Sequence, residues 1–446
     1  MSEPKSFRND ADEKTVINLL ASFCLTLSSF WLTIEASSSV LFLSMKPPYK
    51  RLSKCLDIQL LMECHIEMTI EELTAIKKLN FNMCMQCGEC TGSCPVSPKS
   101  QLNPRRHVLE TTYLVSPLTM RPPLKIYERN EIWDCTTCST CSYLCPREVE
   151  PLDVIIGLRG LLIEQGRIPS TLGDALEGVY KYGNPWGLIR SKRSDWAQDL
   201  KVKYVSEEEK TDLLYFVGCA ASYDSRAQEV ARAIVKNFNA LNIDFSILGN
   251  KETCCGNEIY SLGERGLFEE LVQKNLDLLD RYDVQKIVTT SPHCFHAFKN
   301  RYGRELPVKH YTQYFADLID GGKVKLSGRI EKTATYQDPC FLGKHNDIYD
   351  EPRKIIESIP GVRFVELSRS RKRSVCCEGG GGRMWHDIPG ERLAEGRVRE
   401  ALDVGAEIMV VACPFCLLTF DDAIKTTGNE DKIQVKDIME LVAEAI

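Results

Sequence analysis

Two runs of four cysteines share one spacing, and that spacing suits one class of inorganic cofactor. Both runs read C-x2-C-x2-C-x3-C-P, at Cys84, Cys87, Cys90 and Cys94 and again at Cys135, Cys138, Cys141 and Cys145. This pattern holds cubane [4Fe-4S] clusters, and in two-cluster ferredoxins the last cysteine of each run ligates the other cluster. We therefore expect one cluster on Cys84, Cys87, Cys90 and Cys145, and a second on Cys135, Cys138, Cys141 and Cys94.

A zinc ribbon or a disulfide framework is the alternative use of such cysteines. Structural zinc sites pair two C-x2-C arms, whereas each run here has four thiols and ends in Cys-Pro. A chain of 446 residues with 20 cysteines is also too long for a small disulfide-stapled domain. The pattern favours iron–sulfur clusters, and thus a protein that transfers electrons.

A second set of cysteines recurs at a fixed distance along the chain. Cys219, Cys254, Cys255 and Cys294 are followed by Cys340, Cys376, Cys377 and Cys416, at offsets of 121 residues for the first and 122 for the others. Four matches at one offset indicate an internal duplication. The second copy also contains Cys413, at the position where the first copy has Ser291. Structural zinc is the alternative use of this set.

Alternating strands and helices should position the duplicated cysteines. Strands are expected at 213–217, 245–248, 287–290, 333–336, 364–367 and 408–411, with amphipathic helices between them. Such alternation predicts parallel sheets, and ligands bind at the carboxyl ends of their strands. Gly379–Gly382 would let the backbone approach an inorganic core, and no Gly-Lys-Ser/Thr follows to indicate a phosphate loop.

We expect an α+β multidomain protein, in which an α-helical ferredoxin domain with two clusters precedes two α/β cysteine-rich repeats. Helical spacing at 68–80 and 152–165 flanks the cluster motifs. The expected divisions are a leader at 1–67, the ferredoxin domain at 68–180, a linker at 181–210, and repeats at 211–325 and 326–446.

The N-terminal leader has two interpretations. Residues 16–34 carry no charge and are long enough to cross a bilayer, although the segment is rich in Ser and Thr. Alternatively, the leader is disordered or artefactual and translation begins later, for instance at Met68. The net charge of −6 gives no case for nucleic acid binding.

The arrangement of the cysteines over residues 68–446 resembles the HdrD family of heterodisulfide reductases, which corresponds to HdrC and HdrB fused into one polypeptide. The wider family includes iron–sulfur subunits of anaerobic glycerol-3-phosphate dehydrogenase and of lactate oxidation complexes. The resemblance implies that a complete repeat holds a noncubane [4Fe-4S] cluster, here on the catalytic set Cys340, Cys376, Cys377, Cys413 and Cys416. In the first copy it implies a cofactor site on Cys219, Cys254, Cys255 and Cys294, from which Ser291 removes one ligand. Glu378 stands where the family has Gly.

The resemblance also implies a function. A partner, either a membrane cytochrome b or a flavoprotein, would pass electrons through the two cubanes to a repeat-bound cluster that reduces or forms a disulfide. The alternative is a non-catalytic subunit that links a separate dehydrogenase or reductase to the quinone pool or another carrier. No glycine-rich dinucleotide fingerprint is present. We expect a cytoplasmic protein, held at the inner face of the membrane, if at all, through its partner.

Several charged residues near the cysteines have both a functional and a structural interpretation. Lys344, His345, Arg383 and His386 could bind an anionic substrate or protonate a leaving thiolate, or they could belong to a solvated loop. The basic run 369–373 either faces solvent or docks an acidic partner. His293 and His296 flank Cys294, and either could replace the missing thiolate of the first copy.

Overall fold

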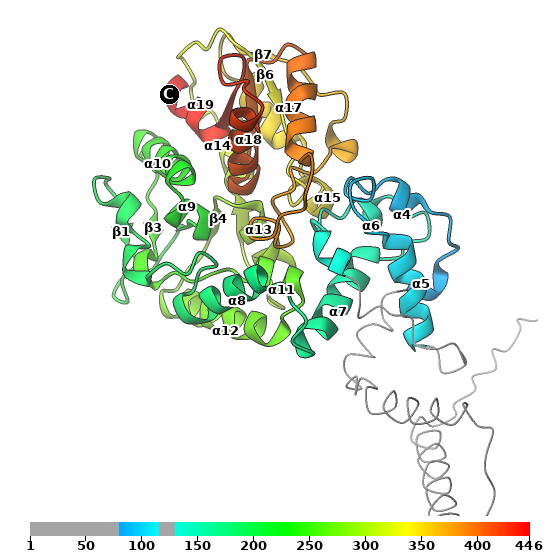
Figure 1. The fold of residues 1–446 in the computed structure, drawn as a ribbon. Helices are drawn as coiled ribbons and strands as arrows, with labels where there is room; N and C mark the ends of the chain where they lie inside the picture. The colour runs from blue at the N-terminus through cyan, green and yellow to red at the C-terminus, as the bar shows by residue number, and fades with distance from the viewer. Residues whose placement is uncertain (1–79, 116–129) are drawn as a thin grey trace, which may run out of the picture. The chain divides into compact units, whose positions relative to one another are not determined.

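The computed structural model describes residues 80–115 and 130–446 (Figure 1). The expected leader, its uncharged segment at 16–34, the later start at Met68 and the helix expected at 68–80 lie outside the described residues. Within the described ranges, no helix combines the length and the apolar character that a membrane crossing requires.

The ferredoxin segment is built from short helices around two cysteine loops. Its α-helices are α4 (Glu89–Gly92), α5 (Pro104–Val115), α6 (Thr140–Tyr143), α7 (Pro151–Glu164) and α8 (Ser170–Tyr182). Single 3-10 turns at Phe81–Met83 and Asn130–Asp134 lead into the two loops. Helix α7 begins at Pro151, whose fixed φ suits the first helical position, and it buries Leu152, Ile155 and Leu158.

The first repeat contains a five-stranded sheet in the order β1-β3-β2-β4-β5, and all paired strands are parallel. Its strands are β1 (Lys203–Tyr204), β2 (Leu214–Phe216), β3 (Ser246–Ile247), β4 (Ile287–Thr289) and β5 (Val308–His310). Its helices are α9 (Cys219–Tyr223), α10 (Ser225–Ala240), α11 (Asn257–Leu262), α12 (Arg265–Arg281), α13 (Pro292–Asn300) and α14 (Tyr311–Asp320). Strand β1 lies in the segment that we expected to be a linker. Short 3-10 turns occupy Arg190–Lys192, Asp195–Ala197 and Gly249–Lys251.

The second repeat contains a four-stranded parallel sheet in the order β7-β6-β8-β9. Its strands are β6 (Thr333–Tyr336), β7 (Arg363–Phe364), β8 (Ile408–Val411) and β9 (Gln434–Asp437). Its helices are α15 (Gly343–Asn346), α16 (Asp350–Glu357), α17 (Leu393–Asp403), α18 (Pro414–Thr426) and α19 (Ile438–Ala445), with a 3-10 turn at Arg371–Arg373. The order reproduces β3-β2-β4-β5 of the first repeat. The predicted fold class and the duplication are therefore confirmed.

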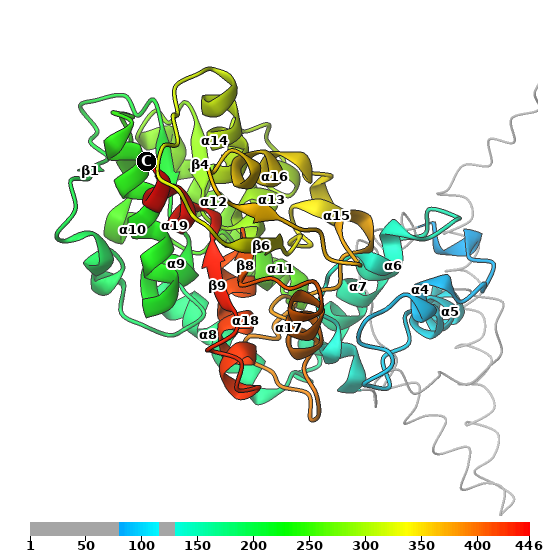
Figure 2. The same cartoon turned by 90° about the horizontal axis from the view of Figure 1, so that it is seen from above.

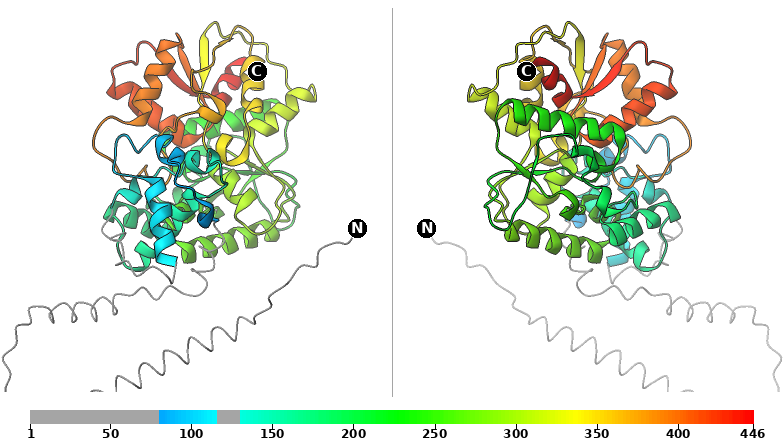
Figure 3. Two further views of the ribbon diagram at one scale, coloured as in Figure 1. Left: turned by 90° about the vertical axis from the view of Figure 1, so that its right-hand side faces the viewer. Right: turned by 90° about the vertical axis from the view of Figure 1, so that its left-hand side faces the viewer.

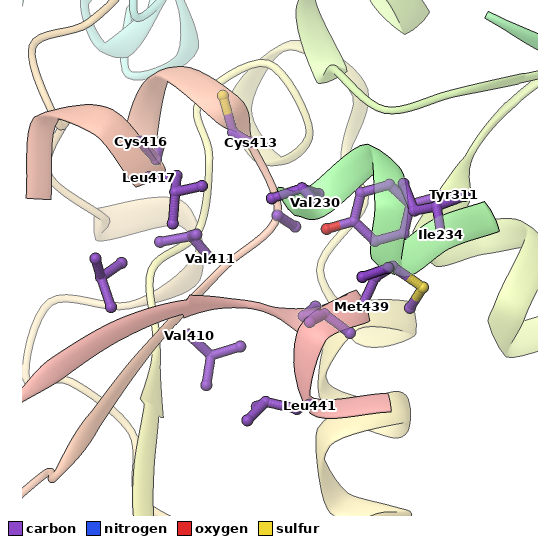
Figure 4. Packing of buried hydrophobic residues seen from close by; sticks show 14 of the residues in the cluster. Val230, Ile234, Tyr311, Val410, Val411, Cys413, Cys416, Leu417, Met439 and Leu441 are labelled. Carbon is purple, nitrogen blue, oxygen red and sulfur yellow. The ribbon is translucent and has the colours of Figure 1, made fainter. Parts of the chain in front are cut away.

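The two repeats share one hydrophobic core. Helix α10 lies beside α19, as the view from above shows (Figure 2), and Arg226 of α10 pairs with Glu440 of α19 through bonds of 2.8 and 2.9 Å. Figure 4 shows Val230 and Ile234 of α10 packed among Tyr311 and Met439. Because both repeats bury apolar side chains in this cluster, we expect neither to keep its full core alone.

Candidate iron–sulfur and redox site

The first ferredoxin group consists of the four cysteines that the crossed pairing assigned to one cluster. Cys84, Cys87, Cys90 and Cys145 line one pocket. Gln86 takes a left-handed backbone (φ 57°) and turns the chain between the successive thiols. Burial raises the pKa of Cys90 to about 11, and the neighbouring thiols of Cys84, Cys145 and Cys87 contribute to the rise. A thiol-only donor set around a pocket fits a thiophilic cluster.

The second ferredoxin group brings together Cys94, Cys135, Cys138 and Cys141. Burial raises the pKa of Cys135 to about 12, and the thiols of Cys94 and Cys138 are among its causes. Thr137 and Ser139 flank Cys138 with left-handed backbones (φ 53° and 60°), which makes the loop tight. Clustered thiols that cannot readily ionise alone are the setting in which a bound cation stabilises thiolates. These residues therefore also fit a cluster.

The third group comprises the cysteines of the second repeat. Cys340 follows β6, Cys376 and Cys377 follow the 3-10 turn 371–373, and Cys413 and Cys416 lie at the start of α18. The Sγ atoms of Cys377 and Cys416 lie 3.2 Å apart. A hydrogen bond with Cys376 raises the pKa of Cys340. Burial opposes ionisation of Cys413, yet hydrogen bonds with Cys416 and His293 lower its pKa to about 5.

The fourth group belongs to the first repeat. Cys219, Cys254, Cys255 and Cys294 line one pocket. Ser291 lies on the same pocket, but its hydroxyl caps α13 by accepting a hydrogen bond of 3.2 Å from the backbone N–H of His293. This capping role gives a structural reason for a serine at this position. Within the described ranges, no group of three or more His, Cys, Asp or Glu side chains is placed to hold a single metal ion.

The second ferredoxin group touches the second repeat directly. Cys138 lies beside Cys376, and the interaction between the two thiols is the leading cause of the raised pKa of Cys138, ahead of burial. The charge of Cys138 also raises the pKa of Cys340. Thr140 supports the contact, with its Oγ1 atom 3.2 Å from the Sγ of Cys138. Cysteines from two domains, more than 200 residues apart in sequence, thus form one continuous set.

The glycine run has a role that we did not predict. A Cβ on Gly381 would collide with the carbonyl oxygen of Cys135, and one on Gly380 would lie 2.9 Å from that of Thr136. The backbone of the second repeat therefore approaches the backbone of the second ferredoxin loop. Gly380 and Gly381 are needed for this docking, and the approach of the glycine run to an inorganic core stays a prediction.

Arg159 of α7 stabilises the same junction, and the sequence did not predict this role. Its guanidinium is fully buried and donates hydrogen bonds to the carbonyls of Ile132, Trp133, Cys135, Ser261 and Gly381, at 2.8–3.2 Å. These carbonyls belong to the second ferredoxin loop and to both repeats. A single arginine in an apolar helix only weakly indicated this role, because the partners of Arg159 are backbone atoms that lie far away in the sequence.

Glu378 occupies a backbone conformation that favours glycine. Its φ is 78°, and Gly256, the equivalent residue of the first repeat, has a φ of 79°. The carboxylate of Glu378 accepts hydrogen bonds of 2.7 Å from Arg383 and 2.6 Å from the N–H of Leu393. These bonds offset the strain of a left-handed residue. They also give the buried guanidinium of Arg383 its counter-charge.

The charged residues that we considered as part of a solvated loop are largely buried. Lys344 is 7% exposed and donates to the carbonyl of Ser374, while His345 stacks on Phe341 and lies 2.9 Å from the carbonyl of Thr137. Arg383 is 5% exposed, and His386 lies 3.9 Å from Asp134. His345 and His386 thus connect the ferredoxin segment to the second repeat, whereas Lys344 and Arg383 bond within the second repeat.

The two histidines beside Cys294 have different surroundings. His293 is paired with Glu258 at 2.8 Å and packs between Phe341 and Phe415, and its hydrogen bond to Cys413 directs it to the second repeat. His296 contacts Asn300 and Asn346, and burial lowers its pKa.

The comparisons with known proteins agree with this architecture. A model described as a cysteine-rich domain matches residues 213–299 and 334–421, and a 4Fe-4S dicluster domain matches residues 80–149. The HdrD polypeptide of dihydromethanophenazine:CoB–CoM heterodisulfide reductase from Methanosarcina barkeri is 33% identical, over 84% of this chain and 96% of its own length. The chain belongs to the HdrD-like family of heterodisulfide reductases.

Other relatives show that this family spans differently named proteins. The probable iron-sulfur-binding oxidoreductase FadF of Bacillus subtilis is 34% identical over 84% of this chain. The EtfAB:quinone oxidoreductase of Syntrophomonas wolfei is 30% identical over 82% of this chain. The chain spans 61% and 58% of the lengths of these two proteins. The relatives of this HdrD-like chain therefore carry names that describe different activities.

Proposed function

We propose that this HdrD-like chain takes electrons from a partner subunit, a membrane cytochrome b or a flavoprotein, and delivers them to the second repeat, where a disulfide is reduced or formed. The observation that carries the proposal is the contact between the second ferredoxin loop and the second repeat, where Cys138 lies beside Cys376 and the backbone of Gly381 approaches that of Cys135. It joins the ferredoxin cysteines to the five-cysteine group without an intervening protein layer.

The four cysteine groups supply the ligands for this role. When bound, [4Fe-4S] clusters supply one-electron carriers whose potentials the protein tunes through hydrogen bonding, charge and solvent exposure. The chain's own residues set the order of the groups. Cys87 is exposed in the first ferredoxin group, whereas Cys135, Cys138 and Cys141 of the second are buried. A partner would therefore meet the first group at the surface.

The second repeat is the better candidate for the reactive site. It has five cysteines, Cys340, Cys376, Cys377, Cys413 and Cys416, whereas the first repeat has four and uses Ser291 as a helix cap. Reduction of a disulfide consumes two electrons and two protons, breaks one S–S bond and yields two thiols. We assign a supporting role to the site of the first repeat. This site consists of Cys219, Cys254, Cys255 and Cys294, which line their own pocket.

A second candidate function is pure electron transfer to the quinone pool or another carrier, with chemistry on a partner. Two observations favour it: Ser291 leaves the first repeat without its fifth cysteine, and one relative is named EtfAB:quinone oxidoreductase. Under this function the same Cys138–Cys376 contact carries the electrons, and the chain itself cleaves no disulfide.

One experiment separates the two functions. Anaerobically purified protein is tested with the heterodisulfide CoM-S-S-CoB and reduced viologen, as wild type, Cys376→Ser and the matched Cys254→Ser. Disulfide reductase function predicts turnover that Cys376→Ser abolishes and Cys254→Ser only slows. Reversed sensitivity would move the reactive site to the first repeat. No turnover, with reducible clusters present, would favour the electron-transfer function.

A further inference from the structure

A cleft opens between the ferredoxin segment and the second repeat. Its volume is about 520 Å³. Gly92, Cys94 and Lys99 line one side, and Arg373, Ser374 and Gly396 are among the residues on the other. Figure 3 (left) shows the blue ferredoxin segment beside the orange segment that contains α17, the two walls of this cleft.

The lining of the cleft is basic in a chain that is acidic overall. Its cationic side chains are those of Lys99, Arg369, Lys372, Arg373 and Arg399. Glu391 is the one acidic residue among the lining residues described, while the whole chain has a net charge of −6. The cleft therefore concentrates positive charge where the rest of the surface repels acidic molecules.

Internal ion pairs leave part of this charge uncompensated. Glu391 interacts with both Lys99 and Arg399, and Glu400 pairs with Arg369. Lys372 lies over the Tyr143 ring, with its Nζ 5.6 Å from the ring centroid. The guanidinium of Arg373 is exposed and has no ion-pair partner among the described residues. Lys372 and Arg373 thus present the free positive charge of the cleft.

The same cleft reaches the junction of the cysteine groups. Cys94 of the second ferredoxin group lies on its wall, and so does Thr140, whose hydroxyl contacts Cys138. Val375, also on the wall, precedes Cys376 directly. A molecule seated in the cleft is therefore close to both groups that the Cys138–Cys376 contact joins.

We propose that this basic cleft docks an acidic electron-transfer protein, which exchanges electrons at the second ferredoxin group without passing the first. The inference rests on the proposed function and adds a second partner, distinct from the one that meets the first ferredoxin group. A protein fits better than a small anion, because Lys372 and Arg373, which carry the free charge, are both exposed at the surface. Such rim charges steer association and make it salt-dependent.

The test uses the full holoprotein and an acidic flavodoxin as the probe. Binding is measured by calorimetry at low and raised salt for wild type, for K372E/R373E, and for the control K323E/K325E. The control makes the same charge change at exposed lysines outside the cleft lining. Iron content and cluster EPR signals verify that each variant is intact.

We expect wild type to bind flavodoxin in a salt-dependent manner, and K372E/R373E to bind at least tenfold more weakly with a smaller salt dependence. K323E/K325E should stay within about twofold of wild type. Equal losses in both variants, or no salt-dependent binding to wild type, would overturn the inference. Tight binding of inorganic phosphate without flavodoxin binding would assign the cleft to a small anion. Because no disulfide turnover is measured, failure here is distinct from failure of the proposed function.

Discussion

The guanidinium of Arg159 donates a hydrogen bond of 3.2 Å to the carbonyl of Gly381, and through it α7 of the ferredoxin segment holds the glycine run of the second repeat. The same side chain bonds to the carbonyl of Cys135 at 2.8 Å. One buried cation therefore fixes the loop of the second ferredoxin group relative to both repeats.

Replacing Arg159 with Met should destabilise the folded protein by about 3 kcal/mol or more, because several buried carbonyls lose a charged donor. Arg159→Lys should lose less stability than Arg159→Met but should not match wild type, since an ammonium has three donors and lacks the planar array of donors of a guanidinium. The free energy of unfolding measured by anaerobic denaturation checks this. R304M is the control, because Arg304 is exposed and pairs with Asp280 at the surface. A loss of stability no larger than that of R304M would contradict the role of Arg159 in holding the junction together.

Gly381→Ala should weaken the docking of the ferredoxin loop by several kcal/mol, because its Cβ would collide with the carbonyl oxygen of Cys135. Gly428→Ala is the matched control: Gly428 has a similar φ (+63° against +67°) but open space around it, so it should lose only about 1 kcal/mol from strain. Thermal unfolding of the two holoproteins measures the difference. Equal losses of thermal stability in the two variants would mean that the close approach of Gly381 to Cys135 does not contribute to stability.

Ser291→Ala should cost about 1 kcal/mol of stability, because the hydroxyl caps α13. Ser291→Thr keeps the oxygen and should lose less. Denaturant unfolding gives both values. If alanine were tolerated as well as threonine, the capping explanation for this serine would be wrong.

Asp437 should make stability fall with rising pH. Burial raises the pKa of Asp437 from 3.8 to about 8, and its carboxylate accepts hydrogen bonds of 2.9 and 2.8 Å from the hydroxyl of Tyr311 in the other repeat. A raised folded-state pKa stabilises the protein at low pH, and this contribution is lost as pH rises from about 4 to about 8.

The variant Asp437→Asn cannot ionise, so its stability relative to wild type should improve as pH rises through this range. The slope for one group is at most about 1.4 kcal/mol per pH unit. Unfolding midpoints across pH 5–9 measure it. A difference between variant and wild type that stays constant with pH would contradict the assignment.

Sequence patterns predicted the fold class and the grouping of the cysteines, because spacing and alternation are local properties. The crossed pairing that places Cys145 with Cys90 follows a rule of two-cluster ferredoxins, and the 122-residue offset predicted the repeated sheets. The roles of Arg159 and Gly381 were not predictable, since their partners are backbone atoms of other domains. The contact of His345 with the carbonyl of Thr137 likewise depends on where the ferredoxin loop docks, which no local pattern encodes.

EPR spectroscopy of the anaerobic, reduced protein tests the central claim that the second ferredoxin group and the second repeat form one electron-transfer unit. Since Cys138 contacts Cys376, paramagnetic clusters on the two groups should interact, giving a broadened or split signal. Cys377→Ser should remove that interaction and leave unsplit ferredoxin signals, whereas Cys255→Ser should leave it in place. Non-interacting signals in the wild type, with all groups loaded with iron, would contradict the account.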